Sequence, residues 1–229
     1  MRASAIVVAA GSGKRLGSDL AKAFVPLAGH PMLYYALRTI ASVDSIVEAV
    51  IAVPAGMEAQ ARAIADSAGL LIPIKLTPGG SQRQHSVRLA LQLISAESDL
   101  VIVHDAARPF ATRSIFEACL EAASRAGGAI AAVPVADTLK RADGKTISAT
   151  VTRDGLWQAQ TPQAFQRELL VRAHRQAEAE QTVATDDADL VERLGAKVEI
   201  VDGAALNFKI TTPADLQLAA ALARFYLAP

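Results

Sequence analysis

The stretch Ala5-Ile-Val-Val-Ala-Ala-Gly-Ser-Gly-Lys-Arg-Leu-Gly17 joins a short apolar strand to a glycine-rich turn that carries two adjacent cations. Glycine accepts positive φ and allows close approach, so main-chain N–H groups of such a turn can point at phosphate oxygens. Lys14 and Arg15 add mobile positive charge at the same place. The stretch therefore favours a nucleoside triphosphate as ligand, bound where the first strand ends.

Two familiar phosphate-binding loops do not fit this stretch. If Gly13-Lys14 were the Gly-Lys pair of a P-loop, the motif would need glycine at position 8 and serine or threonine at position 15. This chain has Val8 and Arg15 there. A dinucleotide-binding fold needs an acid after its second strand, but the strand expected at 46–53 runs into Pro54 without one. The Tyr-x-x-x-Lys pair of a short-chain dehydrogenase is also missing. The NTPase and oxidoreductase classes are therefore disfavoured.

Composition favours one domain over residues 1–229, because 52% of the residues are hydrophobic and can fill a large core. The 23 basic and 23 acidic residues balance, so we expect no nucleic-acid or anionic-lipid surface. Cys119 is the one cysteine, which excludes an internal disulfide or a thiol cluster. The apolar run 5–10 is too short for a signal peptide, and no run approaches the roughly 18 residues of a membrane span. We expect a cytoplasmic protein.

Short β-branched runs alternate with segments of helical periodicity up to residue 134. Strands are expected near 5–9, 46–53, 71–76, 99–104 and 129–134. Helices are expected over 31–42, 56–68, 83–95 and 113–126. This alternation is typical of βα units and predicts an α/β fold, a three-layer α/β/α sandwich around a mostly parallel sheet.

The alternation stops at residues 137–155, where the turn signal Asp143-Gly144 lies between two β-rich flanks. This pattern predicts a protruding β-hairpin arm. An arm rich in Thr, Ile and Val needs another surface to cover it, and a symmetric partner is the least costly one. We therefore expect a homodimer formed through the arm.

After the arm, Trp157 and Phe165 return the chain to the body. Helices near 166–179 and 186–194 and a strand near 197–201 are expected next. Thr212-Pro-Ala-Asp215 has the form of a capping box that opens a terminal helix to about residue 227.

Polar side chains follow the strands at the edge where ligands bind in open α/β sheets. Asp105 is expected beside the glycine loop, where it can bind Mg²⁺ or a sugar hydroxyl; an ion pair with Arg108 that only fixes the turn is the alternative. His104 is interpreted as structural. The segment Gly79-Gly-Ser-Gln-Arg-Gln-His-Ser86 opens a helix and offers Arg83, hydroxyls and backbone groups to a base or ribose, or only a Ser N-cap.

Taken in order, these segments resemble the 2-C-methyl-D-erythritol 4-phosphate cytidylyltransferase family of the non-mevalonate isoprenoid pathway. The motifs that carry the resemblance are Ala9-Ala-Gly-Ser-Gly-Lys-Arg15, Lys22, Gly79-Gly-Ser-Gln-Arg83 with Ser86, His104-Asp-Ala-Ala-Arg-Pro109, Asp137-Thr-Leu-Lys140, Thr152-Arg-Asp-Gly-Leu-Trp157, Thr161-Pro-Gln163, Thr185-Asp186 and Asn207-Phe-Lys-Ile-Thr211. The resemblance implies a Rossmann-like nucleotidyltransferase fold and transfer of CMP from CTP to the methylerythritol phosphate. A ribitol 5-phosphate cytidylyltransferase and a non-catalytic nucleotide-binding regulator are the alternatives.

The resemblance also implies residue roles. The catalytic residues would be Arg15, Lys22, Arg153 and Lys209. The CTP-binding residues would be Ala9, Ala10, Gly11, Gly13, Lys14, Gly80, Ser81, Arg83, Ser86, Asp105 and Ala106. The residues that bind the polyol phosphate or organise its site would be Asp105, Arg108, Thr138, Arg153, Thr161, Thr185 and Lys209. Asp105 would hold Mg²⁺ or another divalent cation. In the family the arm crosses to the other subunit, so Arg153 would serve the neighbouring active site.

Where the family commonly has Pro-Lys-Gln-Tyr, this chain has Leu20-Ala-Lys-Ala-Phe24, so Lys22 keeps its charge without those neighbours. Some members are fused to a cyclodiphosphate synthase domain, a possible partner here. Three segments also fit, taken individually, as caps, turns or surface charge: Thr161-Pro-Gln163, Thr185-Asp-Asp187 and Asn207-Phe-Lys209.

The implied reaction needs no general base, because a phosphate monoester with a second pKa of about 6 is mostly a dianion at pH 7. It needs cations and Mg²⁺ around the phosphates.

Overall fold

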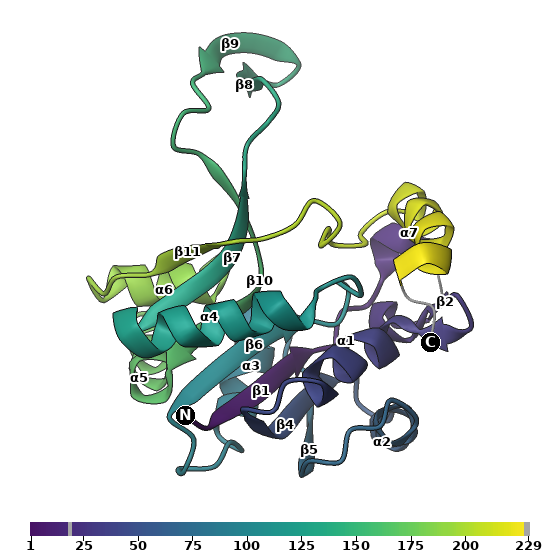
Figure 1. Ribbon diagram of the computed structural model, residues 1–229. Coiled ribbons are helices and arrows are strands. Elements are labelled where there is room, and N and C mark those ends of the chain that lie inside the picture. The colour runs from purple at the N-terminus through teal and green to yellow at the C-terminus, as the bar shows by residue number, and fades with distance from the viewer. Residues whose placement is uncertain (18–19, 227–229) are drawn as a thin grey trace.

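The computed structural model of the protein describes residues 1–17 and 20–226, without the side chains of Lys14 and Tyr226. At its centre lies a seven-stranded sheet in the order β11-β7-β10-β6-β1-β4-β5 (Figure 1). These strands are β1 (Ala3–Val8), β4 (Ile46–Val53), β5 (Ile74–Pro78), β6 (Leu100–Asp105), β7 (Gly128–Pro134), β10 (Trp157–Gln166) and β11 (Glu199–Asp202). Neighbours are parallel except where β10 pairs antiparallel with β6 and β7. The predicted α/β class with a mostly parallel sheet is confirmed.

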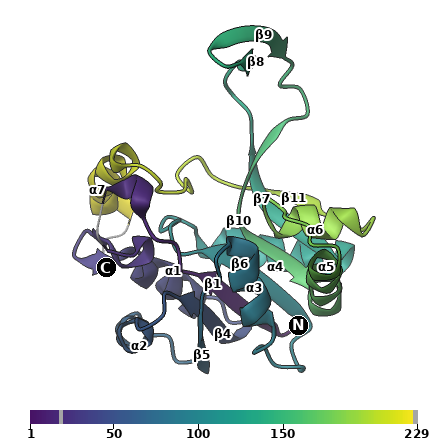
Figure 2. The same cartoon turned by 180° about the vertical axis from the view of Figure 1, so that it is seen from behind.

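Helices cover both faces of this sheet (Figures 1 and 2). The helices on one face are α1 (Met32–Ala41), α2 (Glu58–Ser67) and α4 (Arg113–Ala126), which share one apolar core with that face. The helices on the other face are α3 (Arg83–Leu91), α5 (Arg167–Ala179) and α6 (Asp187–Arg193), which share a second core. The predicted three-layer sandwich is therefore confirmed. None of the described helices is long and apolar enough to span a bilayer.

The terminal helix α7 (Pro213–Tyr226) lies apart from the two main layers, beside the short strand β2 (Pro26–Leu27) (Figure 1). Its start is a reciprocal capping box. The Asp215 amide donates to the Thr212 hydroxyl at 3.2 Å, and the Thr212 amide donates to the Asp215 carboxylate at 2.8 Å. The predicted cap at this position is confirmed.

The arm is a two-stranded hairpin formed by β8 (Leu139–Asp143) and β9 (Thr146–Val151). It projects far from the sheet in both views (Figures 1 and 2), and Ile147 near its tip is 63% exposed. The turn between the strands includes Gly144 at φ 59°, a backbone angle that favours glycine. The predicted hairpin arm is confirmed.

Two predictions about strands differ from the structure. The third strand, expected at 71–76, is β5 at Ile74–Pro78, because Leu71 is 97% exposed and lies before the sheet. Strand β10 was not expected, because its sequence is polar and contains Pro162, and proline is disfavoured in central strands. The ladder with β7 is irregular between Ala159 and Gln163, which is where the proline is accommodated.

Candidate functional site

The register of the sheet brings two loops and one carboxylate to the same edge. Val8, the last residue of β1, lies opposite Asp105, the last residue of β6. The segment after β5 reaches the same edge, because Pro78 pairs with the last residue of β4. A Cβ on Gly79 would lie 2.0 Å from the Cβ of Ala10, so glycine at this position lets the two loops touch. The glycine-rich loop and the 79–86 segment therefore form adjacent walls of one site.

The glycine-rich loop folds back so that Lys22 returns to it. Gly13 has φ +70°, and the Lys22 amide donates to the Gly11 carbonyl at 3.0 Å. Lys22 is the first residue of the 3-10 helix η2 (Lys22–Phe24). The last residue of this turn, Phe24, is buried and packs in the apolar core. Backbone bonding and this apolar anchor thus place Lys22 at the loop.

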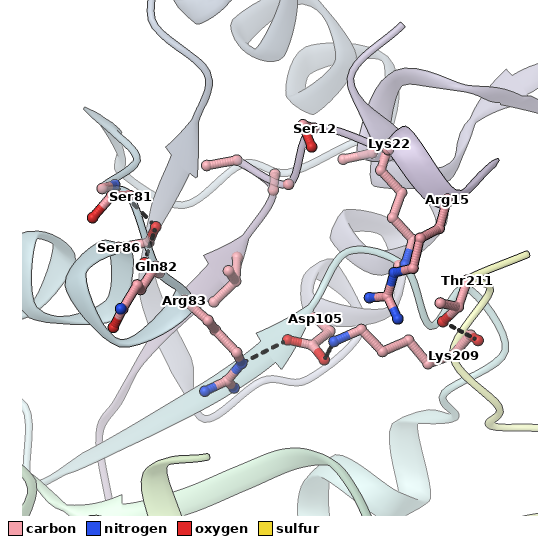
Figure 3. A pocket seen from close by; sticks show the side chains of 18 residues that line it. Ser12, Arg15, Lys22, Ser81, Gln82, Arg83, Ser86, Asp105, Lys209 and Thr211 are labelled. Carbon is pink, nitrogen blue, oxygen red and sulfur yellow. Dashed lines mark hydrogen bonds and ion pairs between the residues drawn. The ribbon is translucent and has the colours of Figure 1, made fainter. Parts of the chain in front are cut away.

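A cavity of about 510 Å³ lies between the two walls (Figure 3). The proposed site residues that line it are Ala9, Ala10, Gly11, Gly13, Arg15, Lys22, Gly80, Ser81, Arg83, Ser86, Asp105 and Lys209. Ser12, Gln82 and Thr211 line it too; they lie in motifs quoted for the resemblance but were given no role. Ala106, which was also expected at this site, does not line the cavity; it is buried, and its amide donates to the Val8 carbonyl at 3.1 Å. The Lys14 side chain lies outside the described part of the chain.

The 79–86 segment has a more specific arrangement than a serine cap. Helix α3 has Gln82 at its N-cap position, without a side-chain cap, so the alternative of a Ser N-cap is wrong. The Ser86 hydroxyl instead accepts from the Gly80 amide at 3.1 Å and donates to the Gln82 carbonyl at 3.2 Å. These bonds hold the turn at the mouth of the cavity.

A second cavity of about 240 Å³ adjoins the first. Its lining consists of Arg83, Asp105, Arg108, Ala159, Gln160, Thr161, Gln163, Thr185, Asp186 and Lys209. Arg83, Asp105 and Lys209 line both cavities, so these three residues form the junction. The structure therefore brings together Arg108, Thr161 and Thr185, which come from distant parts of the sequence. Gln160 was not predicted, because β10 was not recognised as a strand that passes the site; Gln163 and Asp186 lie in motifs quoted for the resemblance but were given no role.

Asp105 is the anionic centre of the junction. It accepts from Arg83 Nε at 3.0 Å and from Lys209 Nζ at 2.7 Å, and these cations reach it from opposite sides (Figure 3). Burial alone would raise the pKa of Asp105, but Arg83 and Lys209 hold it well below its usual range. Arg108 Nε is 4.0 Å away, so the ion pair with Arg108 is the longest of the three. Asp105 is thus an organiser of the site as well as part of a turn.

Arg15 and Lys22 lie side by side across the cavity from Arg83, near Lys209 (Figure 3). Burial, together with repulsion from nearby Lys209 and Arg15, lowers the pKa of Lys22 to about 8, and attraction to Asp105 and Asp215 offsets only part of this shift. Cations that disfavour one another in the free protein are suited to a polyanionic ligand, since its binding relieves their repulsion.

The hydroxyl of Thr161 is already engaged inside the protein. It accepts from the Asp105 amide at 3.0 Å and lies 3.0 Å from His104 Nδ1. Burial lowers the pKa of His104 to about 4, so the imidazole is neutral, and its Nε2 lies 3.2 Å from the Arg108 carbonyl. With Thr161 donating to Nδ1 and Nε2–H donating to the carbonyl, each of these groups has a partner. This bonding supports a structural role for His104 and an organising role for Thr161.

Arg153 and Thr138 do not join the two cavities within one chain. Both are exposed and lie at the base of the arm, and the Arg153 guanidinium donates to the Ala136 carbonyl. Neither residue lines either of the two cavities of its own chain.

Comparison with known proteins agrees with this geometry. Residues 3–227 match the family described as IspD, 2-C-methyl-D-erythritol 4-phosphate cytidylyltransferase. The chain is 48% identical over 222 residues to the enzyme of that name from Deinococcus radiodurans, across 96% of this chain and 89% of that protein. The crystal structure of the Thermus thermophilus enzyme matches with a TM-score of 0.82 at 38% identity, across 98% of this chain and 100% of that one. The bifunctional IspDF from Campylobacter jejuni matches with a TM-score of 0.75 at 26% identity, across 95% of this chain and 54% of that one. The chain therefore belongs to the 2-C-methyl-D-erythritol 4-phosphate cytidylyltransferase family of nucleotidyltransferases.

Proposed function

We propose that the chain transfers CMP from CTP to 2-C-methyl-D-erythritol 4-phosphate, giving 4-diphosphocytidyl-2-C-methyl-D-erythritol and pyrophosphate. The observation that carries this proposal is the junction of two cavities at Arg83, Asp105 and Lys209. The cavity of about 510 Å³ is in the range of nucleotide-sized ligands, whereas the one of about 240 Å³ suits a short polyol phosphate. Ligands bound in both would meet at the junction.

The reaction in this arrangement is a direct displacement. An oxygen of the polyol phosphate forms a bond to the α-phosphorus of CTP, and the bond from that phosphorus to the pyrophosphate oxygen breaks. The attacking phosphate is already ionised at pH 7, so no proton has to be removed. Arg15 and Lys22 stabilise the charge that develops on the triphosphate, and Lys209 neutralises the entering phosphate. Positioning and charge compensation supply the catalysis.

A divalent cation, expected to be Mg²⁺, fits this site through Asp105. Among the described residues, no group of three His, Cys, Asp or Glu side chains could hold a metal by itself. Mg²⁺ does not need such a group, because it is usually held by one or two carboxylates together with phosphates and water. When bound, the cation would neutralise triphosphate charge. Asp105 would then share its carboxylate with Arg83 and Lys209.

The arm supports a homodimer in which each Arg153 serves the neighbouring active site. Its exposed β-strands need cover, and Arg153 lies outside the cavities of its own chain. Mixing two impaired variants, Lys22→Ala and Arg153→Ala, at a polyol-phosphate concentration well below the raised KM of Arg153→Ala tests this arrangement. If Arg153 acts across the dimer, subunit exchange restores one complete site per mixed dimer and activity returns. If Arg153 acts within its own chain, mixing restores nothing, and a fully active Arg153→Ala variant would show that Arg153 has no role.

Pyrophosphate release tests the substrate assignment. Purified protein with CTP and Mg²⁺ is offered 2-C-methyl-D-erythritol 4-phosphate and ribitol 5-phosphate in parallel, with Arg125→Gln as a control that removes an exposed cation far from the cavities. Selective turnover of the methylerythritol compound by wild type and control is expected. Selective turnover of ribitol phosphate would keep the mechanism and replace the substrate. No pyrophosphate release with either compound, in a protein that still binds CTP, would favour a nucleotide-binding regulator.

A further inference from the structure

A chain of buried ionisable groups extends from the junction into the protein. The Arg83 guanidinium, which lines both cavities, donates from Nη1 to Asp187 Oδ2 at 2.6 Å. On its other side, Asp187 Oδ1 lies 3.0 Å from His174 Nε2. The side chains of Asp187 and His174 are only 1% and 2% exposed, and neither lines either of the two cavities described above. Helices α6 and α5 thus place a carboxylate and an imidazole directly behind Arg83.

Such an arrangement is costly unless it serves a purpose. Removing a carboxylate from water carries a large desolvation cost, which a partner only partly offsets. Burial alone would raise the pKa of Asp187, but Arg83 and His174 hold it below its usual range. An apolar residue at this position would pack between α5 and α6 without that cost. The cost of burying this network therefore suggests a function at Arg83, the member of the network that lines the two cavities.

Arg83 is held by two carboxylates on different elements. Its Nε donates to Asp105 on β6, and its Nη1 donates to Asp187 on α6. An arginine side chain has a rotamer entropy of about 2 kcal/mol, so an unrestrained guanidinium would sample many positions. Two fixed acceptors determine the plane of the guanidinium and leave Nη2, which has no protein partner among the described residues. Nη2 is itself buried, so a ligand at the junction would meet the part of the Arg83 side chain that lines the two cavities, which the two carboxylates hold in one position.

We propose that Asp187 is a positioning residue that holds the Arg83 guanidinium at the junction of the two cavities, with His174 fixing Asp187 from behind. Arg83 makes the ligand contact, and Asp187 acts through it. This inference rests on the proposed function, because its effect is measured as turnover of CTP and the polyol phosphate.

The test is a double-mutant cycle that joins Asp187→Asn to Arg83→Gln. Asparagine keeps the shape of Asp187 and removes its charge, so kcat/KM should fall about tenfold. In the Arg83→Gln background the same change should have almost no further effect, because the residue through which Asp187 acts is gone. A purely structural role would lower stability in both backgrounds and would not depend on Arg83.

The matched control is Glu178→Gln. It removes the Arg88–Glu178 ion pair, which links α3, the helix of Arg83, to α5, the helix of His174, at 2.6 Å. Its kcat/KM should equal that of wild type. A normal kcat/KM in Asp187→Asn, or losses that add fully in the double variant, would overturn the proposal. Wild-type turnover, measured first, decides the proposed function independently of this cycle.

A second variant covers the case in which Asp187→Asn does not fold. His174→Phe keeps an aromatic ring and both carboxylates and removes the donor to Asp187, together with Nδ1, which has no partner among the described residues. We expect a smaller fall in kcat/KM that again disappears in the Arg83→Gln background. A fall of equal size in both backgrounds would show that the network stabilises the fold without positioning Arg83.

Discussion

Raising the pH above about 8 should deprotonate Lys22 and lower kcat/KM for CTP. Burial of the ammonium group, with repulsion from Lys209 and Arg15, lowers its pKa from 10.5 to about 8, and attraction to Asp105 and Asp215 does not offset this. The free protein should therefore lose one cation from its triphosphate-binding wall within a range of pH that is readily assayed.

The size of the effect follows from a single titration. A group with a pKa of about 8 is about 90% charged at pH 7 and about 10% charged at pH 9, so kcat/KM for CTP should fall about tenfold between these values. Both substrates are already ionised in this range, so no opposing rise is expected. Bound triphosphate raises the pKa of Lys22, so the fall in kcat should lie at a higher pH than the fall in kcat/KM.

Unfolding does not explain such a loss. The folded pKa of Lys22 lies below the unfolded value, so the unfolded chain binds this proton more tightly. The contribution of Lys22 to the free energy of unfolding therefore increases as the pH rises from about 8 to 10.5.

Initial rates of pyrophosphate release at low CTP, from pH 6.5 to 9.5, measure the effect. Lys22→Arg is the control, because its guanidinium stays charged throughout and its profile should be flat even if its rate is lower. A wild-type kcat/KM that stays level to pH 9.5, or an equal fall in Lys22→Arg, would refute the reasoning.

The other predictions concern single substitutions. Arg15→Ala should lower kcat about 10²–10³-fold, as expected for loss of one preorganised donor, with an unchanged melting temperature; a near-normal kcat would remove Arg15 from catalysis. Arg153→Ala should raise KM for the polyol phosphate more than KM for CTP, and steady-state kinetics with each substrate varied would reveal the opposite order. Gly79→Ala should raise KM for CTP, because its methyl group would lie 2.0 Å from the Cβ of Ala10; an unchanged KM would show that the two walls can separate freely. Phe116→Ala should lower the free energy of unfolding by about 3–5 kcal/mol, since Phe116 is fully buried; denaturant titration measures this, and a loss below about 1 kcal/mol would contradict it.

The sequence was sufficient for most of the fold because the central strands are buried on both faces. The residues of β4 and β6 form nearly continuous apolar runs, and such runs predict strands of a parallel sheet. Local chemistry also identified the glycine-rich loop and the Thr212–Asp215 cap. These features depend on residues that are neighbours in sequence, so their signals can be read directly.

The parts that could not be predicted depend on distant residues. β10 has a polar sequence with Pro162, and only the strands on either side of it give it a place in the sheet. The cavity residues Gln160 and Gln163 follow from that placement. The pair formed by Arg83 and Asp187 joins residues separated by 104 positions, and no local pattern predicts that one buried carboxylate will meet one particular guanidinium.

The stereochemistry at phosphorus tests most directly whether CMP passes between the adjoining cavities in one displacement. CTP with a single thiophosphate configuration at the α-phosphorus is turned over with 2-C-methyl-D-erythritol 4-phosphate, and the configuration of the product is determined. In-line attack by the substrate phosphate predicts inversion. Retention would contradict direct transfer and would require a covalent intermediate on the protein.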